Sequence, residues 1–149
     1  IHESSHNKLN LIMQKDKLIL SDMTEKYYSA YRPDARHIHG IYLGLHAFAP
    51  VIYILMKAYR DGLMWDSPWW LDKIILYYLK NKVTYRVLVK HAKLTKLWEE
   101  ILGEMKYVID LTDKIFLDIP QGREVLSEVK DYQKQHFMDV NRNYPHLEY

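Results

Sequence analysis

The sequence contains no cysteine and few residues of the kinds that interrupt regular structure. Its 149 residues include only five glycines and five prolines. Without cysteine the chain can form no disulfide, no zinc site with cysteine ligands and no thiol nucleophile. Glycine and proline are too scarce for a fold of many short strands, which needs frequent turns. The sequence also contains no Asn-x-Ser/Thr glycosylation site.

Long hydrophobic runs are missing as well. The longest mainly apolar stretch covers residues 41–56, and it contains His46 and Pro50. A transmembrane helix needs about 20 apolar residues, so we interpret this stretch as a buried or interfacial helix, kinked at Pro50, and not as a membrane anchor. Hydrophobic residues nevertheless make up 48% of the chain, which is enough for the core of a single domain of residues 1–149.

Apolar residues recur at steps of three and four along most of the chain, which is the period of an amphipathic helix. No segment alternates in the manner of a strand. These patterns predict an all-α, single-domain bundle of five or six helices joined by short turns. We expect a loose N-terminus at residues 1–8 and a C-terminal tail at residues 141–149. The helices are expected at about residues 8–31, 35–59, 68–82, 85–102, 104–118 and 123–140.

Local signals predict where several of these helices begin and end. Gly62 has the position of a left-handed glycine that ends the second helix. The Asp-Ser-Pro run at residues 66–68 combines capping side chains with proline at the first helical position of the third helix. Thr84 is expected to cap the fourth helix, and Gly103 to mark the end of that helix or a kink in the chain.

The net charge is only +2, but the charges are unevenly distributed. Residues 73–96 contain seven Lys and Arg and no Asp or Glu, whereas residues 101–149 contain six Lys and Arg against nine Asp and Glu. Arg86, Lys90 and Lys93 are spaced by four and three residues, which places them on one face of a helix. The basic residues are predicted to form a stripe that binds an anionic membrane or glycoprotein; a solvated helix face is the alternative. The stripe consists of Lys73, Lys80, Lys82, Arg86, Lys90, Lys93 and Lys96.

Tryptophan and methionine gather around the turn that follows the second helix. Trp69 and Trp70 are adjacent, so at most one of them can easily face the core of a bundle. The other would then be exposed and could enter a bilayer interface or a partner's groove, because tryptophan suits the boundary between headgroups and acyl chains. Burial of both under neighbouring helices is the alternative. The predicted apolar patch consists of Met64, Trp65, Trp69 and Trp70.

Few residues form a pattern typical of catalysis. The His-Glu-Ser-Ser-His run at residues 2–6 matches the zinc-protease motif, but it lies in a polar terminus without an apolar face or an obvious third ligand. His37, His39 and His46 lack the spacings of three or four residues that metal ligands on a helix prefer, so core or boundary histidines are the simpler interpretation. A glycine-rich phosphate loop, a serine nucleophile motif and a nucleic-acid-binding fingerprint are missing. We therefore expect no catalytic residue, no metal or cofactor, no small-molecule substrate and no nucleic-acid partner.

Three segments carry a resemblance to a known family. They are residues 55–65, residues 72–81 (DKIILYYLKN) and residues 137–145 (FMDVNRNYP). Their order and spacing, with the absent cysteines, the abundant tyrosine and tryptophan and a mass of 18.0 kDa, resemble the abalone sperm acrosomal proteins, the family of lysin and its 18-kDa fusogenic paralogue. The resemblance covers about residues 40–145 and depends on patterns of residue type.

The resemblance implies a five-helix bundle that is cleaved from a signal peptide, stored in the acrosomal vesicle of sperm and released extracellularly. A chain that begins with Ile1 in place of methionine fits this expectation. The family has no catalytic residues: lysin opens the vitelline envelope of the egg non-enzymatically, and the paralogue is thought to promote fusion of sperm and egg membranes. Because lysin is far more basic and the last third of this chain is acidic, the fusogenic paralogue is favoured.

The expected function is therefore that of a secreted, non-enzymatic protein that binds and perturbs membranes and promotes sperm–egg fusion. Its partner would be the egg plasma membrane, and it would act as a monomer or weak dimer. The alternative is dissolution of the egg envelope by stoichiometric binding of an egg-coat glycoprotein, as in lysin. A third alternative is an unrelated helical enzyme or metal protein that uses His39 and His46.

Overall fold

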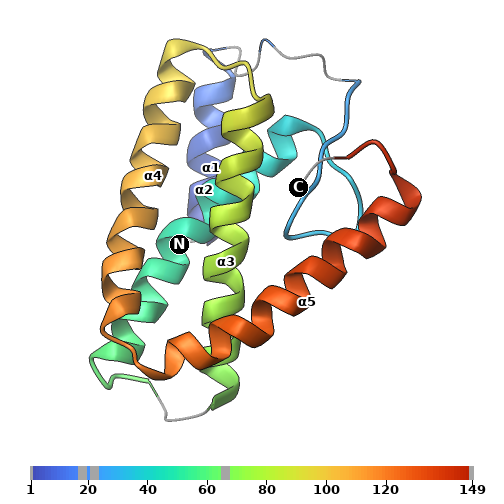
Figure 1. The fold of residues 1–149 in the computed structure, drawn as a ribbon. Helices are drawn as coiled ribbons and strands as arrows, with labels where there is room; N and C mark the ends of the chain where they lie inside the picture. The colour runs from blue at the N-terminus through green and yellow to red at the C-terminus, as the bar shows by residue number, and fades with distance from the viewer. Residues whose placement is uncertain (1, 17–19, 21–23, 65–67, 148–149) are drawn as a thin grey trace.

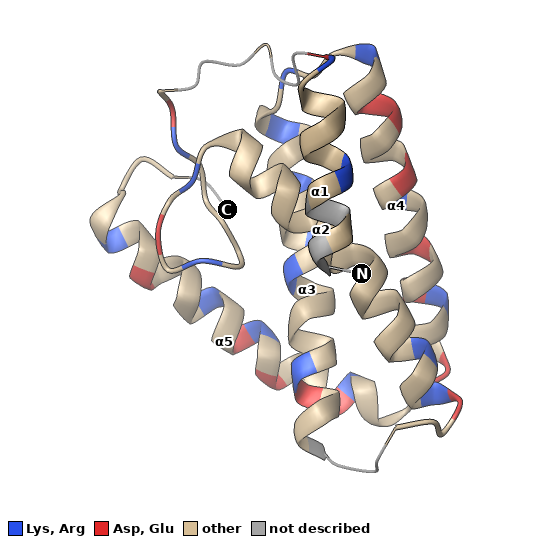
Figure 2. Ribbon diagram, turned by 180° about the vertical axis from the view of Figure 1, so that it is seen from behind, with Lys and Arg blue, Asp and Glu red and all other residues tan. Residues whose placement is uncertain are grey.

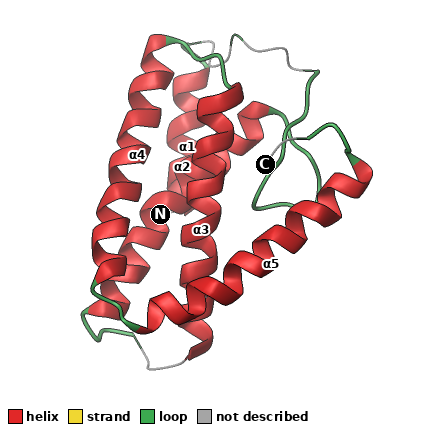
Figure 3. Ribbon diagram, viewed as in Figure 1, coloured by secondary structure: helices red, strands yellow, loops and turns green. Residues whose placement is uncertain are grey.

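The computed structural model describes the whole chain except residues 1, 17–19, 21–23, 65–67 and 148–149. The described residues form an all-α bundle without strands (Figure 1, Figure 3), which confirms the predicted fold class. Its helices are α1 (His2–Met13), α2 (Ile38–Arg60), α3 (Pro68–His91), α4 (Lys96–Leu117) and α5 (Gln121–Asn143).

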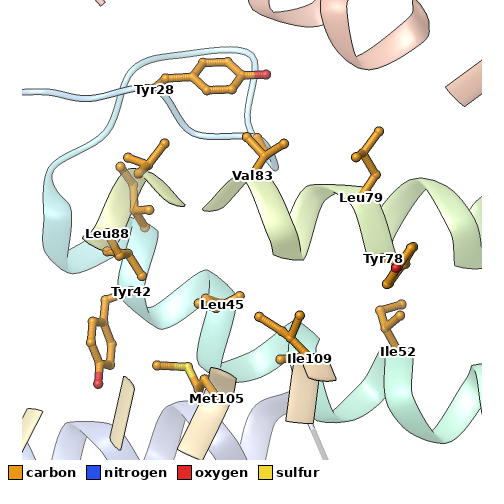
Figure 4. Packing of buried hydrophobic residues seen from close by; sticks show 14 of the residues in the cluster. Tyr28, Tyr42, Leu45, Ile52, Tyr78, Leu79, Val83, Leu88, Met105 and Ile109 are labelled. Carbon is orange, nitrogen blue, oxygen red and sulfur yellow. The ribbon is translucent and has the colours of Figure 1, made fainter. Parts of the chain in front are cut away.

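The central helix of the bundle is α2, as its nearly uniform apolar composition predicts. It packs against α1, α3 and α4. By length and composition α2 could cross a bilayer, but here it supplies the core, to which Leu45 belongs together with Leu88 of α3 and Met105 of α4 (Figure 4). Pro50 lies inside α2 and the helix continues through it without a break.

The junction between α2 and α3 follows the predicted signals. Gly62 has a φ of 69°, in the left-handed region that favours glycine. The N–H groups of Gly62 and Leu63 donate to the carbonyls of Tyr59 and Ala58 at 3.1 and 2.9 Å, so a Schellman motif ends α2. Helix α3 begins at Pro68, as predicted, whereas the expected capping residues at 66–67 lie outside the described part of the chain.

The helix cap predicted at Thr84 and the helix end predicted at Gly103 are wrong. Thr84 is fully buried inside α3, because α3 packs against α2 and α5 along its length and carries the helix through a residue that would otherwise suit a cap. Gly103 lies inside α4. A single glycine in a helix costs only about 1 kcal/mol relative to alanine, which the burial of Trp98 and Met105 in the same helix offsets.

The N-terminal third differs most from the prediction. The loose segment expected at residues 1–8 and the helix expected at about 8–31 are both wrong, because α1 covers His2–Met13 and the described residues between α1 and α2 are irregular. At the other end, the tail expected from residue 141 begins later, since α5 continues to Asn143, and it is not loose throughout because Leu147 is buried in the core.

A closed loop replaces the second half of the expected first helix. Tyr27 and Arg36 pair through two backbone hydrogen bonds of 2.8 and 2.9 Å. Between them Tyr28 and Ala30 are buried. A loop and not a helix therefore brings Tyr28 and Ala30 into the core, because long-range packing overrides a weak local preference.

Candidate functional site

Two exposed tryptophans stand at the start of α3. Trp69 is 57% and Trp70 38% exposed, and their rings meet edge to face with centroids 5.0 Å apart. Leu63, in the turn before them, is 79% exposed. Large apolar side chains are seldom grouped in this way on the surface of a monomer without a role in binding. We call Leu63, Trp69 and Trp70 the tryptophan edge.

The tryptophan edge differs in part from the predicted apolar patch. Trp69 and Trp70 belong to both, and both are exposed, although the sequence predicted that only one would be and Trp70 is more covered than Trp69. Met64 is partly buried and packs against the core, so Leu63 takes its place at the surface. Trp65 lies outside the described residues.

A lysine stands directly beside the aromatic pair. The Nζ atom of Lys73 lies 5.7 Å from the centre of the Trp69 ring, which is the geometry of a cation–π contact. Lys73 is one turn further along α3 than Trp69 and is exposed. The edge therefore presents apolar rings with a positive charge immediately next to them.

A groove between α2 and α3 opens beside Trp70. It has a volume of 230 Å³ and, among the described residues, is lined by apolar side chains and Lys73. The groove is not among the predicted sites, although Gly44, Phe48, Val51 and Leu55 follow a helical stripe that could have indicated an unfilled face. The residues of this α2–α3 groove are Phe48, Val51, Ile52 and Leu55 of α2 and Trp70, Lys73, Ile74 and Tyr77 of α3.

An aromatic wall closes the far end of the groove. Tyr31 stacks on Phe48 at 4.8 Å and lies 6.3 Å from Tyr77. Its ring packs so closely on Gly44 that a Cβ atom there would stand 3.0 Å from it, and its hydroxyl donates to Asn81 at 2.5 Å. Burial raises the pKa of Tyr31 far above its usual value, so its hydroxyl keeps the proton that it donates to Asn81.

The predicted basic stripe is not a single surface. Lys80 is only 8% exposed, and Lys82 pairs with Asp113 of α4 at 3.0 Å. The prediction of one continuous stripe is therefore wrong, and the reason is geometric. Because residues 68–91 form one helix, Lys73 and Lys80 share a face, whereas Lys82 points about 160–200° away from them. Figure 2 shows Lys and Arg spread over several helices.

The remaining members of the stripe cluster at the opposite end of α3. Arg86, Lys90, Lys93 and Lys96 are exposed where α3 ends and α4 begins; we call these four the basic end. Arg86 lies 17 residues after Trp69, which corresponds to about 25 Å along a helix. The positive charges of the basic end are thus far from the exposed rings of Trp69 and Trp70, and only Lys73 lies beside them.

The described histidines before and within α2 have separate partners. The Nδ1 atom of His37 lies 2.9 Å from the carbonyl of Glu25, and the Nε2 atom of His39 lies 3.3 Å from the sulfur of Met13. Burial lowers the pKa of His39. No group of three or more His, Asp or Glu within the described ranges is placed to hold an ion. The side chains of the motif at residues 2–6 lie outside them, apart from the exposed Ser4.

The tryptophan edge and the adjoining groove present apolar surface at one end of α3, and the basic end presents positive charge at the other. Among the ionisable groups next to the groove, burial raises the pKa of Tyr31 and lowers the pKa of Lys80. Comparison with protein-family models, with curated proteins and with solved structures finds no match for this chain.

Proposed function

We propose that this protein binds membrane interfaces through the tryptophan edge and perturbs them without catalysis. One observation carries the proposal: Trp69 and Trp70 are both exposed and their rings are in contact, and Leu63, six residues earlier in the chain, is exposed as well. Tryptophan favours the headgroup boundary because its ring is apolar and its N–H can still reach water. The resemblance to sperm acrosomal proteins extends the proposal to a secreted acrosomal protein that promotes fusion of sperm and egg membranes.

The expected binding is reversible. If about 200 Å² of the edge entered the interface, apolar burial would contribute about 5 kcal/mol at about 25 cal/mol per Å². Lys73 would add about 1 kcal/mol on an anionic surface. This is far less than the free energy of inserting a transmembrane helix, so the protein would adsorb, disturb lipid packing and leave again.

Vesicle binding tests the proposal directly. We expect wild-type protein at micromolar concentration to bind vesicles of phosphatidylcholine and phosphatidylserine, to shift its tryptophan fluorescence to the blue and to cause lipid mixing and leakage. The variant Trp69→Ala/Trp70→Ala should lose most of this binding. A matched control is Tyr107→Ala/Tyr132→Ala, which removes two exposed rings from α4 and α5. Vesicles that stay intact and unbound with wild-type protein would contradict the proposal.

The separation of the basic end from the tryptophan edge favours one alternative. A cationic surface without exposed aromatic rings suits an anionic egg-coat glycoprotein, as in lysin. Isolated egg envelopes would then dissolve in linear proportion to the protein added, and Arg86→Glu/Lys96→Glu would abolish dissolution while Trp69→Ala/Trp70→Ala would not. The opposite pattern supports the membrane proposal.

A further inference from the structure

The α2–α3 groove begins at the tryptophan edge and leads away from it. Trp70 belongs to both, and it lines the groove together with Leu55 near the junction of α2 and α3. At the other end Phe48 and Tyr77 also line a second hollow, of 540 Å³. Phe48 and Leu55 are seven residues apart, which corresponds to about 10 Å of helix. A ligand entering beside the edge would therefore lie along the two helices.

The lining of the groove favours a hydrocarbon chain over a peptide. An extended peptide carries a backbone N–H and C=O at nearly every residue, and burying these without partners is unfavourable. Beyond Lys73, the hydroxyl of Tyr77 and the indole N–H of Trp70, the described lining offers no polar side chain to pair with them, and no carboxylate or amide that could accept from a peptide N–H. A volume of 230 Å³ corresponds to about eight groups of water or methylene size at about 30 Å³ each, which fits part of one acyl chain.

The charges beside the groove favour an anionic headgroup. Lys73 and Lys80 lie on the same face of α3, and the ammonium group of Lys80 is 5.2 Å from the ring centre of Tyr77. Burial, together with the charge of Lys73, lowers the pKa of Lys80. Among the described residues neither lysine forms an ion pair with a carboxylate. Arg32 and Arg36, at the far hollow, share the single carboxylate of Asp34, whereas Lys73 lines the groove itself.

We propose that the α2–α3 groove takes up one acyl chain of an anionic phospholipid whose phosphate is held by Lys73. The inference rests on the proposed function, because the tryptophan edge would hold the protein at the bilayer from which the chain is drawn. Lys73 stands beside Trp69, at the level where headgroups lie. A chain that leaves the bilayer for the groove leaves a gap among its neighbours, which explains how a non-enzymatic protein disturbs lipid packing.

Binding of a soluble lipid to the wild-type protein tests the groove without vesicles. The probe is a lysophosphatidate with a short acyl chain, used below its micelle concentration and carrying bromine near the chain end. We expect saturable binding by calorimetry and quenching of tryptophan fluorescence, since Trp70 lines the groove. Lysophosphatidylcholine of the same chain length should bind at least several-fold more weakly, and inorganic phosphate alone should not bind measurably. Equal binding of phosphate alone, or an absence of quenching, would overturn the inference.

A matched pair of variants on α2 locates the site. Val51→Phe fills the groove and should weaken lysophosphatidate binding at least ten-fold. Ile54→Phe adds comparable bulk at an exposed position of the same helix that does not line the groove, and should bind as wild type does. Lys73→Gln should remove the preference for lysophosphatidate over lysophosphatidylcholine. Equal effects of Val51→Phe and Ile54→Phe would refute the site, and Leu55→Phe serves as a second filling variant if Val51→Phe unfolds.

Vesicle experiments separate this inference from the proposed function. Val51→Phe should still bind vesicles through the tryptophan edge but should cause several-fold less leakage than wild type. If the variant perturbs vesicles as strongly as wild type, the groove proposal fails and the proposed function stands. If wild-type protein does not bind vesicles at all, the proposed function fails. Wild-type protein could also form a dimer that binds no lipid and that Val51→Phe converts to a monomer. That result would overturn the inference and identify the groove as a contact between two copies of the chain.

Discussion

Single glycines in this protein have different roles that depend on their neighbours. A Cβ atom at Gly122 would lie 2.8 Å from Cε2 of Phe116 and 3.5 Å from Cδ1 of Ile75. Phe116 has little room to move, because its ring is buried and stacks on Tyr78. At Gly103 a Cβ atom would meet nothing within 4 Å. Gly122 therefore permits the close approach of α5 to the core, whereas Gly103 has no contact that requires glycine.

We predict opposite effects for the same substitution at these two positions. Gly122→Ala should lower the free energy of unfolding by about 1–3 kcal/mol, the usual cost of overpacking. Gly103→Ala should raise it by about 0.5–1 kcal/mol, since alanine loses less backbone entropy in a helix. Urea denaturation followed by circular dichroism measures both. Changes of the same sign in the two variants would contradict the packing described here.

The attachment of α5 depends on a small buried polar network. The N–H of Gln133 donates to the hydroxyl of Tyr28 at 2.5 Å, and this hydroxyl lies 2.7 Å from Nδ1 of His136. Burial, followed by the nearby charge of Lys80, lowers the pKa of His136. The carbonyl of Arg32 and the carboxylate of Asp139 act in the opposite direction on that pKa. The Nδ1 atom of a neutral imidazole can accept a hydrogen bond from the Tyr28 hydroxyl. A protonated imidazole carries hydrogen on both nitrogens and cannot accept it, so the hydroxyl would lose this partner.

Acid should therefore weaken the attachment of α5. The folded state keeps His136 neutral to a lower pH than the unfolded chain, whose histidine titrates near about 6.5. As the pH falls through this value the unfolded state binds the proton first, so the free energy of unfolding decreases until the pH passes the folded pKa. Urea midpoints measured between pH 5 and 8 should show this decline, and His136→Gln should reduce its slope. An unchanged slope in the variant would assign the pH dependence to other groups, such as His39.

At the scale of the whole molecule, α3 separates two surfaces of different chemistry. The tryptophan edge is at its N-terminal end and the basic end at its C-terminal end, with Trp69 and Arg86 about 25 Å apart along the helix. The Debye length is only about 10 Å at 0.1 M salt. When the edge touches a bilayer, the basic end is screened from the lipid charge and Lys73 is not.

Charge reversal should therefore have unequal effects at the two ends. We expect Lys73→Glu to weaken binding to anionic vesicles more than Arg86→Glu/Lys96→Glu does, although the double variant changes twice the charge. Lys130→Glu/Lys134→Glu on α5 is the control for net charge, because both lysines are exposed. Vesicle sedimentation at 0.1 M salt gives the affinities. If the double variant at the basic end abolishes binding, that end and not the tryptophan edge contacts the membrane.

Features that depend on a few neighbouring residues were predictable from the sequence. Helical content, the central position of α2, the left-handed turn at Gly62 and the start of α3 at Pro68 all follow from local periodicity and backbone chemistry. The exposure of at least one of Trp69 and Trp70 was predictable too, because adjacent side chains of a helix point in different directions.

The amino-acid sequence by itself therefore determined the class of the fold and the places where glycine or proline constrains the backbone. Tertiary structure alone decided that residues 24–37 form a loop, that Thr84 and Lys80 are buried, that Lys82 pairs with Asp113, and that a groove remains between α2 and α3. The physical reason is that local rules describe the stability of each helix, whereas the faces that become buried, paired or hollow depend on which helices meet and how closely their side chains fit.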